Sequence, residues 1–193
     1  MKNIITCTCV LALALLAGCA TQPPSSSRVA AYSETIELSG RISVNYQKEG
    51  NSESLSGKFN WQQSAQRTSV SLASPLGQTI AVIEVTPGVA RLTQAGQPPR
   101  EAADIDALTA QALGWPLPVS GLRDWLQGHA VSSDGSRFRA SPQHNSVITR
   151  DGWRVHFISW QDETALLPQP KRIDAERVSE VALRIVIDDQ AQP

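Results

Sequence analysis

The residues with catalytic or metal-binding potential do not assemble into a recognisable motif. His129, His144 and His156 lie far apart in the chain, without the short spacings of a metal site. No Gly-x-Ser-x-Gly elbow, glycine-rich phosphate loop or EF-hand pattern accompanies them. The acidic pairs at 162–163 and 188–189 consist of adjacent residues, which point to opposite faces of an extended segment. We therefore predict that the protein is not an enzyme and holds no metal ion or cofactor.

Tryptophan is the more informative residue type. The chain has 5 tryptophans against 2 tyrosines and 3 phenylalanines. Trp61, Trp153 and Trp160 fall in strand patterns, Trp125 falls in a helical pattern, and Trp115 stands beside a proline. Such large, rigid apolar side chains suit the wall of a lipid cavity, but they also fill the core of a curved sheet. Both interpretations remain open at this point.

The first residues of the chain predict export and lipidation. Lys2 precedes an apolar run from Val10 to Ala17, which is too short to span a bilayer and is typical of a signal peptide. The run ends in Leu16-Ala17-Gly18-Cys19, which resembles the lipobox of bacterial lipoproteins. We predict a signal peptide over 1–18 and a Cys19 that carries S-diacylglycerol and N-acyl lipid. The alternative is an ordinary secreted protein that is cleaved at a nearby small residue.

The residues that follow predict a tether and a location. The Pro- and Ser-rich stretch after Cys19 cannot build a core, so we expect a flexible tether over 19–33 and one domain over 34–193. Ala20 replaces the aspartate that tends to retain enterobacterial lipoproteins in the inner membrane, which favours the periplasmic face of the outer membrane. Cys7 and Cys9 leave with the signal peptide, so no disulfide is expected.

The segment Ser74-Pro75-Leu76-Gly77 is a candidate for membrane contact. Proline at its second position and glycine at its fourth are typical of a type I turn, which leaves Leu76 at a loop tip. Such an exposed leucine is common in soluble proteins. On a chain tethered to a membrane, however, Pro75, Leu76 and Gly77 form a candidate membrane-insertion loop.

Composition favours apolar function over ionic function. The net charge of -1 argues against nucleic-acid binding. With 41% hydrophobic and only 18% charged residues, the chain is globular and lightly charged. Arg41, Arg67 and Arg91 are candidates for steering an acidic partner, although solvation of a strand face is the simpler role for them.

Hydrophobic periodicity predicts a mainly β fold of about ten antiparallel strands with a two-helix insertion. Alternating apolar residues indicate a first strand from about Thr35 and a second strand that runs back after a turn at 48–51. The same alternation indicates strands at 68–73, 79–86 and 89–94. Helical spacing begins near Asp104, a capping residue, and a second short helix is expected over 119–127. Further strands are predicted around Phe138, 147–148, 153–157, Ile173 and 181–187. A curved sheet that is covered by helices encloses a cavity.

An ordered set of short motifs resembles the LolB family of outer-membrane lipoprotein receptors. Besides the lipobox and the Ser74-Pro75-Leu76-Gly77 segment, the matching pieces are Phe59-Asn60-Trp61-Gln62-Gln63, Gly114-Trp115-Pro116-Leu117-Pro118, Leu122-Arg123-Asp124-Trp125-Leu126 and Trp153-Arg154-Val155. No single piece is specific, but their order is.

The resemblance implies an incomplete, half-open antiparallel β-barrel of about ten to eleven strands, with a short helical lid over a hydrophobic cavity. It implies that Trp61, Trp125, Trp153, Phe59 and Leu122 line a cavity for acyl chains. It also implies the partners: the periplasmic carrier LolA, lipoprotein cargo and outer-membrane phospholipid, with the protein itself a monomer. The remaining alternative is a lipid-anchored structural or interaction module that docks a protein partner on its concave sheet.

Overall fold

A computed structural model describes residues 27–177 and 180–191 of the chain. The predicted signal peptide over 1–18 and the predicted lipidation site Cys19 lie outside the described residues. Within them, the chain forms twelve strands and two helices. Ten strands make one antiparallel sheet in the order β6-β5-β4-β3-β2-β1-β12-β11-β10-β9, and two make a small sheet, β7-β8. The sheet is open, since β6 and β9 form its two edges.

The elements follow the predicted order. The first half of the sheet contains β1 (Ile36–Lys48), β2 (Asn51–Gln63), β3 (Thr68–Ala73), β4 (Thr79–Thr86), β5 (Val89–Gln94) and β6 (Arg100–Ala102). The helices are α2 (Ile105–Leu113) and α3 (Val119–Trp125). The second half contains β7 (His129–Val131), β8 (Arg137–Arg139), β9 (Ser146–Ile148), β10 (Arg154–Trp160), β11 (Pro170–Arg177) and β12 (Val181–Ala191).

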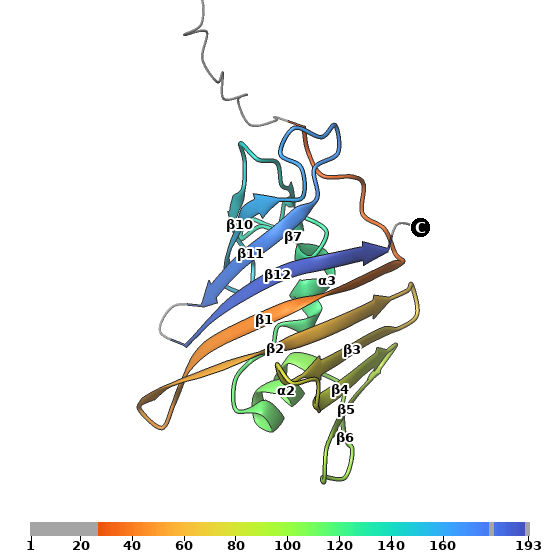
Figure 1. The fold of residues 1–193 in the computed structure, drawn as a ribbon, viewed down its shortest axis with the longest axis vertical. Coiled ribbons are helices and arrows are strands. Elements are labelled where there is room, and N and C mark those ends of the chain that lie inside the picture. Colours follow the sequence, from red (N-terminus) through yellow and green to blue (C-terminus); the bar gives the residue numbers. More distant parts are fainter. Residues whose placement is uncertain (1–26, 178–179, 192–193) are drawn as a thin grey trace, which may run out of the picture.

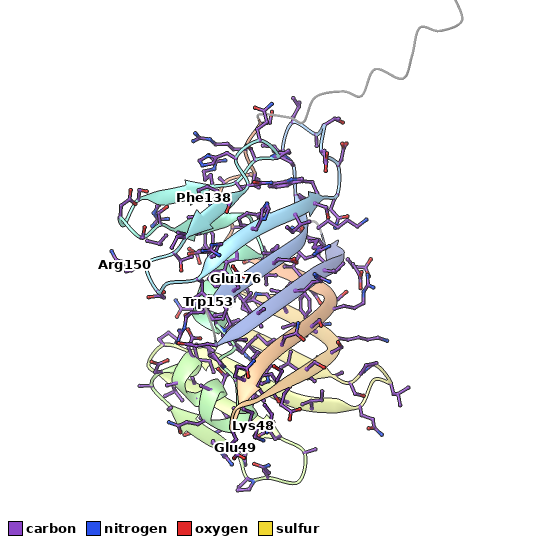
Figure 2. The ribbon with its side chains drawn as sticks, turned by 90° about the vertical axis from the view of Figure 1, so that its left-hand side faces the viewer. Lys48, Glu49, Phe138, Arg150, Trp153 and Glu176 are labelled. Atoms are coloured by element: carbon purple, nitrogen blue, oxygen red, sulfur yellow. The ribbon has the colours of Figure 1, made fainter. Side chains whose placement is uncertain are left out.

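Alternation of apolar and polar residues builds the long strands. In β1, Ile36, Leu38, Ile42 and Val44 are buried, and polar residues between them face outward. The turn from β1 to β2 has φ of 51° at Glu49 and 82° at Gly50, the two positive values that a two-residue type I′ hairpin requires. Figure 2 shows Lys48 and Glu49 in this turn, at one extremity of the molecule.

Two glycines let neighbouring groups approach the centre of the sheet closely. A Cβ on Gly40 would lie 2.1 Å from the Val186 carbonyl oxygen and 2.8 Å from the Phe59 ring. The pairing of β1 with β12 shifts register between Ser39 and Gly40, which marks a bulge. A Cβ on Gly57 would lie 2.4 Å from the Ala73 carbonyl oxygen. Glycines and bulges at such positions allow a sheet to bend.

The two helices cover one face of the bent sheet, as Figure 1 shows. Asp104 begins α2 as predicted, because its carboxylate accepts from the backbone N–H groups of Asp106 (2.9 Å) and Ala107 (3.1 Å). Gly114 ends α2 with a left-handed φ of 81°. We call α2, α3, the connecting residues 114–118 and the residues 126–127 that end α3 the lid.

The predicted fold class is confirmed, because ten strands form one open antiparallel sheet, and the short strands β7 and β8 form a second, small one. One expectation needs correction. The flexible tether predicted over 19–33 does not extend to its last residues. Val29 is only 1% exposed, and its N–H donates to the Ala140 carbonyl oxygen (2.9 Å). Residues 29–33, which we call the strap, are therefore packed on the domain.

Candidate functional site: an apolar wall beneath the lid

The inner face of the sheet and the underside of the lid meet at an apolar site. The void left between them has a volume of only about 20 Å³, room for about one water molecule. Its lining is entirely apolar and comes from four strands and the lid. The lining residues are Ile42, Phe59, Trp61, Val70, Leu72, Leu117, Leu122, Leu126 and Ile185.

Three of the five predicted cavity residues line this void, and two do not. Phe59 and Trp61 come from β2, and Leu122 comes from α3. Trp125 and Trp153 are both buried, and their ring centroids lie 5.6 Å apart in an edge-to-face contact. This pair lies outside the lining of the void and joins α3 to the start of β10, near the Glu176 end of β11 in Figure 2.

The polar N–H of Trp61 is satisfied by a neighbour on its own strand. Trp61 Nε1 donates to Gln63 Oε1 (3.1 Å), and Gln63 Nε2 donates to the Tyr32 hydroxyl (2.9 Å). Gln63 is buried on the inward face of β2. The wall of the site is therefore hydrogen-bonded to the strap.

Arg123 of α3 fastens the lid to the rim of the sheet. Its guanidinium donates to the Thr68 hydroxyl and to the Ser64 carbonyl oxygen (3.4 Å), and it lies 3.7 Å from a Glu34 carboxylate oxygen. Thr68 is fully buried, so its hydroxyl depends on this partner. Arg123 lies within one of the matching sequence motifs, but helical spacing alone did not indicate that it bonds to the sheet.

Asp106 links the two helices of the lid. Its carboxylate accepts from the Ser120 N–H (3.2 Å) and from the Ser120 hydroxyl. Burial is the largest influence on this carboxyl and raises its pKa above the ordinary value. Thr109, also on α2, donates from its hydroxyl to the Leu117 carbonyl oxygen (3.1 Å). These bonds make α2 and α3 one unit.

The strap clamps the end of the lid. The Ser33 N–H donates to Gln127 Oε1 (2.9 Å), and Gln127 Nε2 donates back to the Ser33 carbonyl oxygen (3.1 Å). Val29 packs against Gly128, where an added Cβ would lie 2.5 Å from a Val29 methyl group. His129 Nε2 donates to the Ala30 carbonyl oxygen (2.9 Å), and burial lowers the pKa of this imidazole. Sequence periodicity could not reveal the strap, because it forms no regular element.

The predicted loop tip is formed as expected. The Gly77 N–H donates to the Ser74 carbonyl oxygen (2.9 Å), which closes a β-turn, and the Ser74 N–H donates to the Gln78 carbonyl oxygen (2.8 Å). The Leu76 side chain is 91% exposed. It is the most exposed of the large apolar side chains in the part of the chain that the structure describes.

The three arginines considered for steering are already paired. Arg41 lies 2.8 Å from Asp188, and Arg67 and Arg91 form ion pairs with Glu84 and Glu101. Since each charge is neutralised on the sheet surface, this set offers no net positive field. No described helix is long and apolar enough to cross a membrane. Among the described residues, no cluster of three or more potential ligand side chains exists that would hold a metal ion.

Comparison with known proteins identifies the family. The model of the family "Outer membrane lipoprotein LolB" matches residues 34–189. The chain belongs to the LolB family. A LolB from Cupriavidus pinatubonensis is 38% identical over 194 residues, which cover 96% of this chain and 94% of that protein. A LolB from Cupriavidus necator is 39% identical and covers 93% of each chain. Both relatives are named as outer-membrane lipoproteins.

Membership of the LolB family confirms several predictions made from the residues. The resemblance is correct, and the protein belongs to a family of outer-membrane lipoproteins and not of enzymes. Among solved structures, a LolA superfamily protein from Nitrosomonas europaea aligns over 86% of this chain and 88% of its own, with a TM-score of 0.47 and 8% identity.

Proposed function

We propose that the protein is anchored through lipid on Cys19 at the periplasmic face of the outer membrane. There it accepts lipoproteins from the periplasmic carrier LolA and inserts them into the inner leaflet. LolB family membership supports this function. The observation that bears on it most directly is the apolar wall, which is contributed by four strands and covered only by the lid leucines.

Energetics explain why such a protein needs a covered apolar site. Transfer of an acyl chain of about fifteen methylenes from water into an apolar environment is favourable by roughly 12 kcal/mol. No nucleotide-binding motif is present in the sequence, so transfer must run downhill through differences in apolar burial. The site must therefore pass the chains directly from the carrier to the bilayer.

The closed site holds no acyl chain. Its void of about 20 Å³ accommodates one water molecule at most, so cargo can enter only if the lid leucines move off the wall. Leu117, Leu122 and Leu126 are the side chains that must leave. The bonds of Arg123 and Gln127 at the rim of the lid are the polar contacts that break with this movement.

The Leu76 loop is proposed to deliver the cargo to the membrane. Replacing Leu76 with glutamate leaves the fold intact, because the side chain contacts solvent. We expect Leu76→Glu to keep cargo binding and to lose cargo insertion into liposomes, since a carboxylate resists entry into the bilayer. Val89→Glu is the matched control, because Val89 is also exposed but lies at the start of β5, beside a different turn. Unimpaired insertion by Leu76→Glu would remove the loop from the mechanism.

The alternative function, docking of a protein on the concave sheet, is not favoured. The lid already occupies that face and buries Leu117, Leu122 and Leu126 against it. A partner would find no free concave surface unless the lid moved. A lipid-probe binding assay separates the two functions, because only an acyl-chain acceptor binds the probe at this site.

A further inference from the structure

A second exposed apolar tip lies in the loop between β10 and β11. In this loop, residues 161–169, Leu166 is 87% exposed and Leu167 is 59% exposed. Only Leu76 is more exposed than Leu166 among the large apolar side chains that the structure describes. Neither leucine was singled out by the sequence patterns, and the transfer function proposed above does not use them.

The base of this loop is held by hydrogen bonds. The Gln161 N–H donates to the Gln169 carbonyl oxygen (2.9 Å), and Gln161 Nε2 donates to the Ile187 carbonyl oxygen (3.3 Å). Asp162 Oδ1 accepts from the Thr164 N–H (2.8 Å) and hydroxyl (2.7 Å). The two leucines therefore project from a supported loop.

The loop lies at the end of the sheet where the chain enters the domain. Antiparallel pairing places the loop after β10 at the same end of the strands as the start of β1. Figure 1 shows the beginning of the described chain beside this loop, and Figure 2 shows both at the same extremity. The Leu76 loop, which follows β3, lies at the opposite end of the strands, with the turn at Glu49.

The length of the chain before the strap keeps this end close to a membrane. Residues 20–28 join Cys19 to the buried Val29, and even fully extended they span only about 30 Å. If Cys19 is lipidated as proposed, the membrane lies within about 30 Å of Val29, and the described chain begins beside the loop that carries Leu166 and Leu167. The loop contains Asp162 and Glu163 but no lysine or arginine, so its contact with phospholipid must be apolar and not electrostatic.

We infer that Leu166 and Leu167 insert into the headgroup region of the membrane that anchors the protein. This contact rests on the proposed lipidation of Cys19 but not on cargo transfer. It holds the domain by its tethered end, and the Leu76 tip then points away from that contact.

Site-directed fluorescence quenching tests the inference. The processed, lipidated protein has no other thiol if Cys7 and Cys9 are removed and Cys19 is acylated, so a single introduced cysteine can carry an environment-sensitive fluorophore. Leu166→Cys, Val89→Cys and Leu76→Cys would be labelled and reconstituted in phosphatidylethanolamine and phosphatidylglycerol vesicles that contain nitroxide-bearing phospholipid. Val89 is the matched control, because its turn lies at the same end of the strands as the 161–169 loop.

The expected result is quenching at position 166 that is several-fold stronger than at position 89 and at position 76. Raising the salt concentration, or using phosphatidylcholine vesicles, should leave the quenching unchanged, because the contact is apolar. Equal quenching at 166 and 89, or none at 166, would overturn the inference. So would quenching at 166 that disappears at high salt.

The same experiment separates this inference from the proposed function. The double variant Leu166→Glu, Leu167→Glu, labelled at an introduced Ala165→Cys, should lose the quenching. In a cargo-transfer assay, it should still accept cargo. A protein that transfers cargo normally but shows no quenching at 166 contradicts only the membrane contact. Quenching at 166 in a protein that accepts no cargo contradicts only the transfer function.

Discussion

Trp61 and Trp153 differ in what surrounds them, although both are buried tryptophans. Trp61 lines the apolar void, whereas Trp153 packs on Trp125 and lies with its ring 5.8 Å from the Arg177 guanidinium carbon. We expect Trp61→Ala and Trp153→Ala each to lower the free energy of unfolding by about 3–5 kcal/mol.

Only the Trp61 change should alter the affinity of a fluorescent acyl probe, because Trp61 lines the wall and Trp153 does not. Chemical denaturation and probe titration measure the two effects separately. The more conservative pair Trp61→Phe and Trp153→Phe serves if either alanine variant does not fold. Equal probe affinity in the variants at 61 and 153 would mean that Trp61 is simply a core residue.

His129 should make the stability of the domain depend on pH. Burial lowers the pKa of this imidazole below its ordinary 6.5. As pH falls through 6.5, the unfolded chain therefore binds a proton that the folded chain does not, and the free energy of unfolding decreases. Well above pH 6.5, His129 is neutral in both the folded and the unfolded protein and contributes nothing to the pH dependence of stability.

An NMR titration of the imidazole and denaturation curves between pH 7.5 and about 5.5 test this expectation. His129→Gln keeps a donor for the Ala30 carbonyl oxygen and should reduce the slope. An imidazole that titrates at or above 6.5 in the folded protein would contradict the prediction.

In the proposed function, the lid is the element that must move, because it covers the apolar wall. Arg123→Met keeps the apolar stem of the side chain but removes its bonds to Thr68 and Ser64. Hydrogen bonds to a charged group contribute about 1.5–3 kcal/mol, so α3 should open more readily. Hydrogen exchange should then be faster in α3, and the acyl probe should enter the site faster.

Arg154→Met is the matched control for this change. Arg154 forms an ion pair with Glu176 on the exposed surface of the sheet, where such a pair contributes at most about 1 kcal/mol. Exchange in α3 that is equally slow in the Arg123 variant and the control would show that Arg123 does not hold the lid.

Features of the fold that depend on local contacts were predictable from the sequence, whereas features that depend on distant contacts were not. The alternating pattern predicted the bounds of β3, β4 and β5, because each strand buries one face and tertiary contacts only reinforce this. The cap at Asp104 and the exposed Leu76 followed from equally local chemistry. The three-residue strand β6 offered too few residues for a pattern to show.

The site was less predictable than the elements that build it. Phe59, Trp61 and Leu122 were expected together, and they line one void. Ile185 lines the same void but comes from β12, and only the register of the whole sheet brings it there. Docking of Val29 depends on the space beside Gly128, which no pattern in residues 27–35 can indicate.

The start of β1, where the chain enters the domain, and the Leu76 loop lie at opposite ends of the strands. If the domain is anchored through Cys19 and delivers cargo through Leu76, as proposed, it must turn relative to the membrane, and the length of residues 20–28 limits how far it can turn. We expect deletion of residues 22–26 to impair cargo insertion while cargo binding stays unchanged.

Replacement of residues 22–26 by a Gly/Ser stretch of equal length should restore insertion, because the length and not the composition matters in this range. Insertion into liposomes and cargo binding in solution are the two measurements. Full insertion activity in the shortened protein would mean that the domain need not turn.

The large sheet terminates on each flank in a strand of only three residues, β6 and β9. Long unpaired strand flanks are templates on which other chains add and polymerise. Here each flank presents too little free backbone to start such growth. If copies of the protein are held close together on one membrane, as the proposed lipid anchor implies, these short edge strands keep them separate molecules and prevent fibrils.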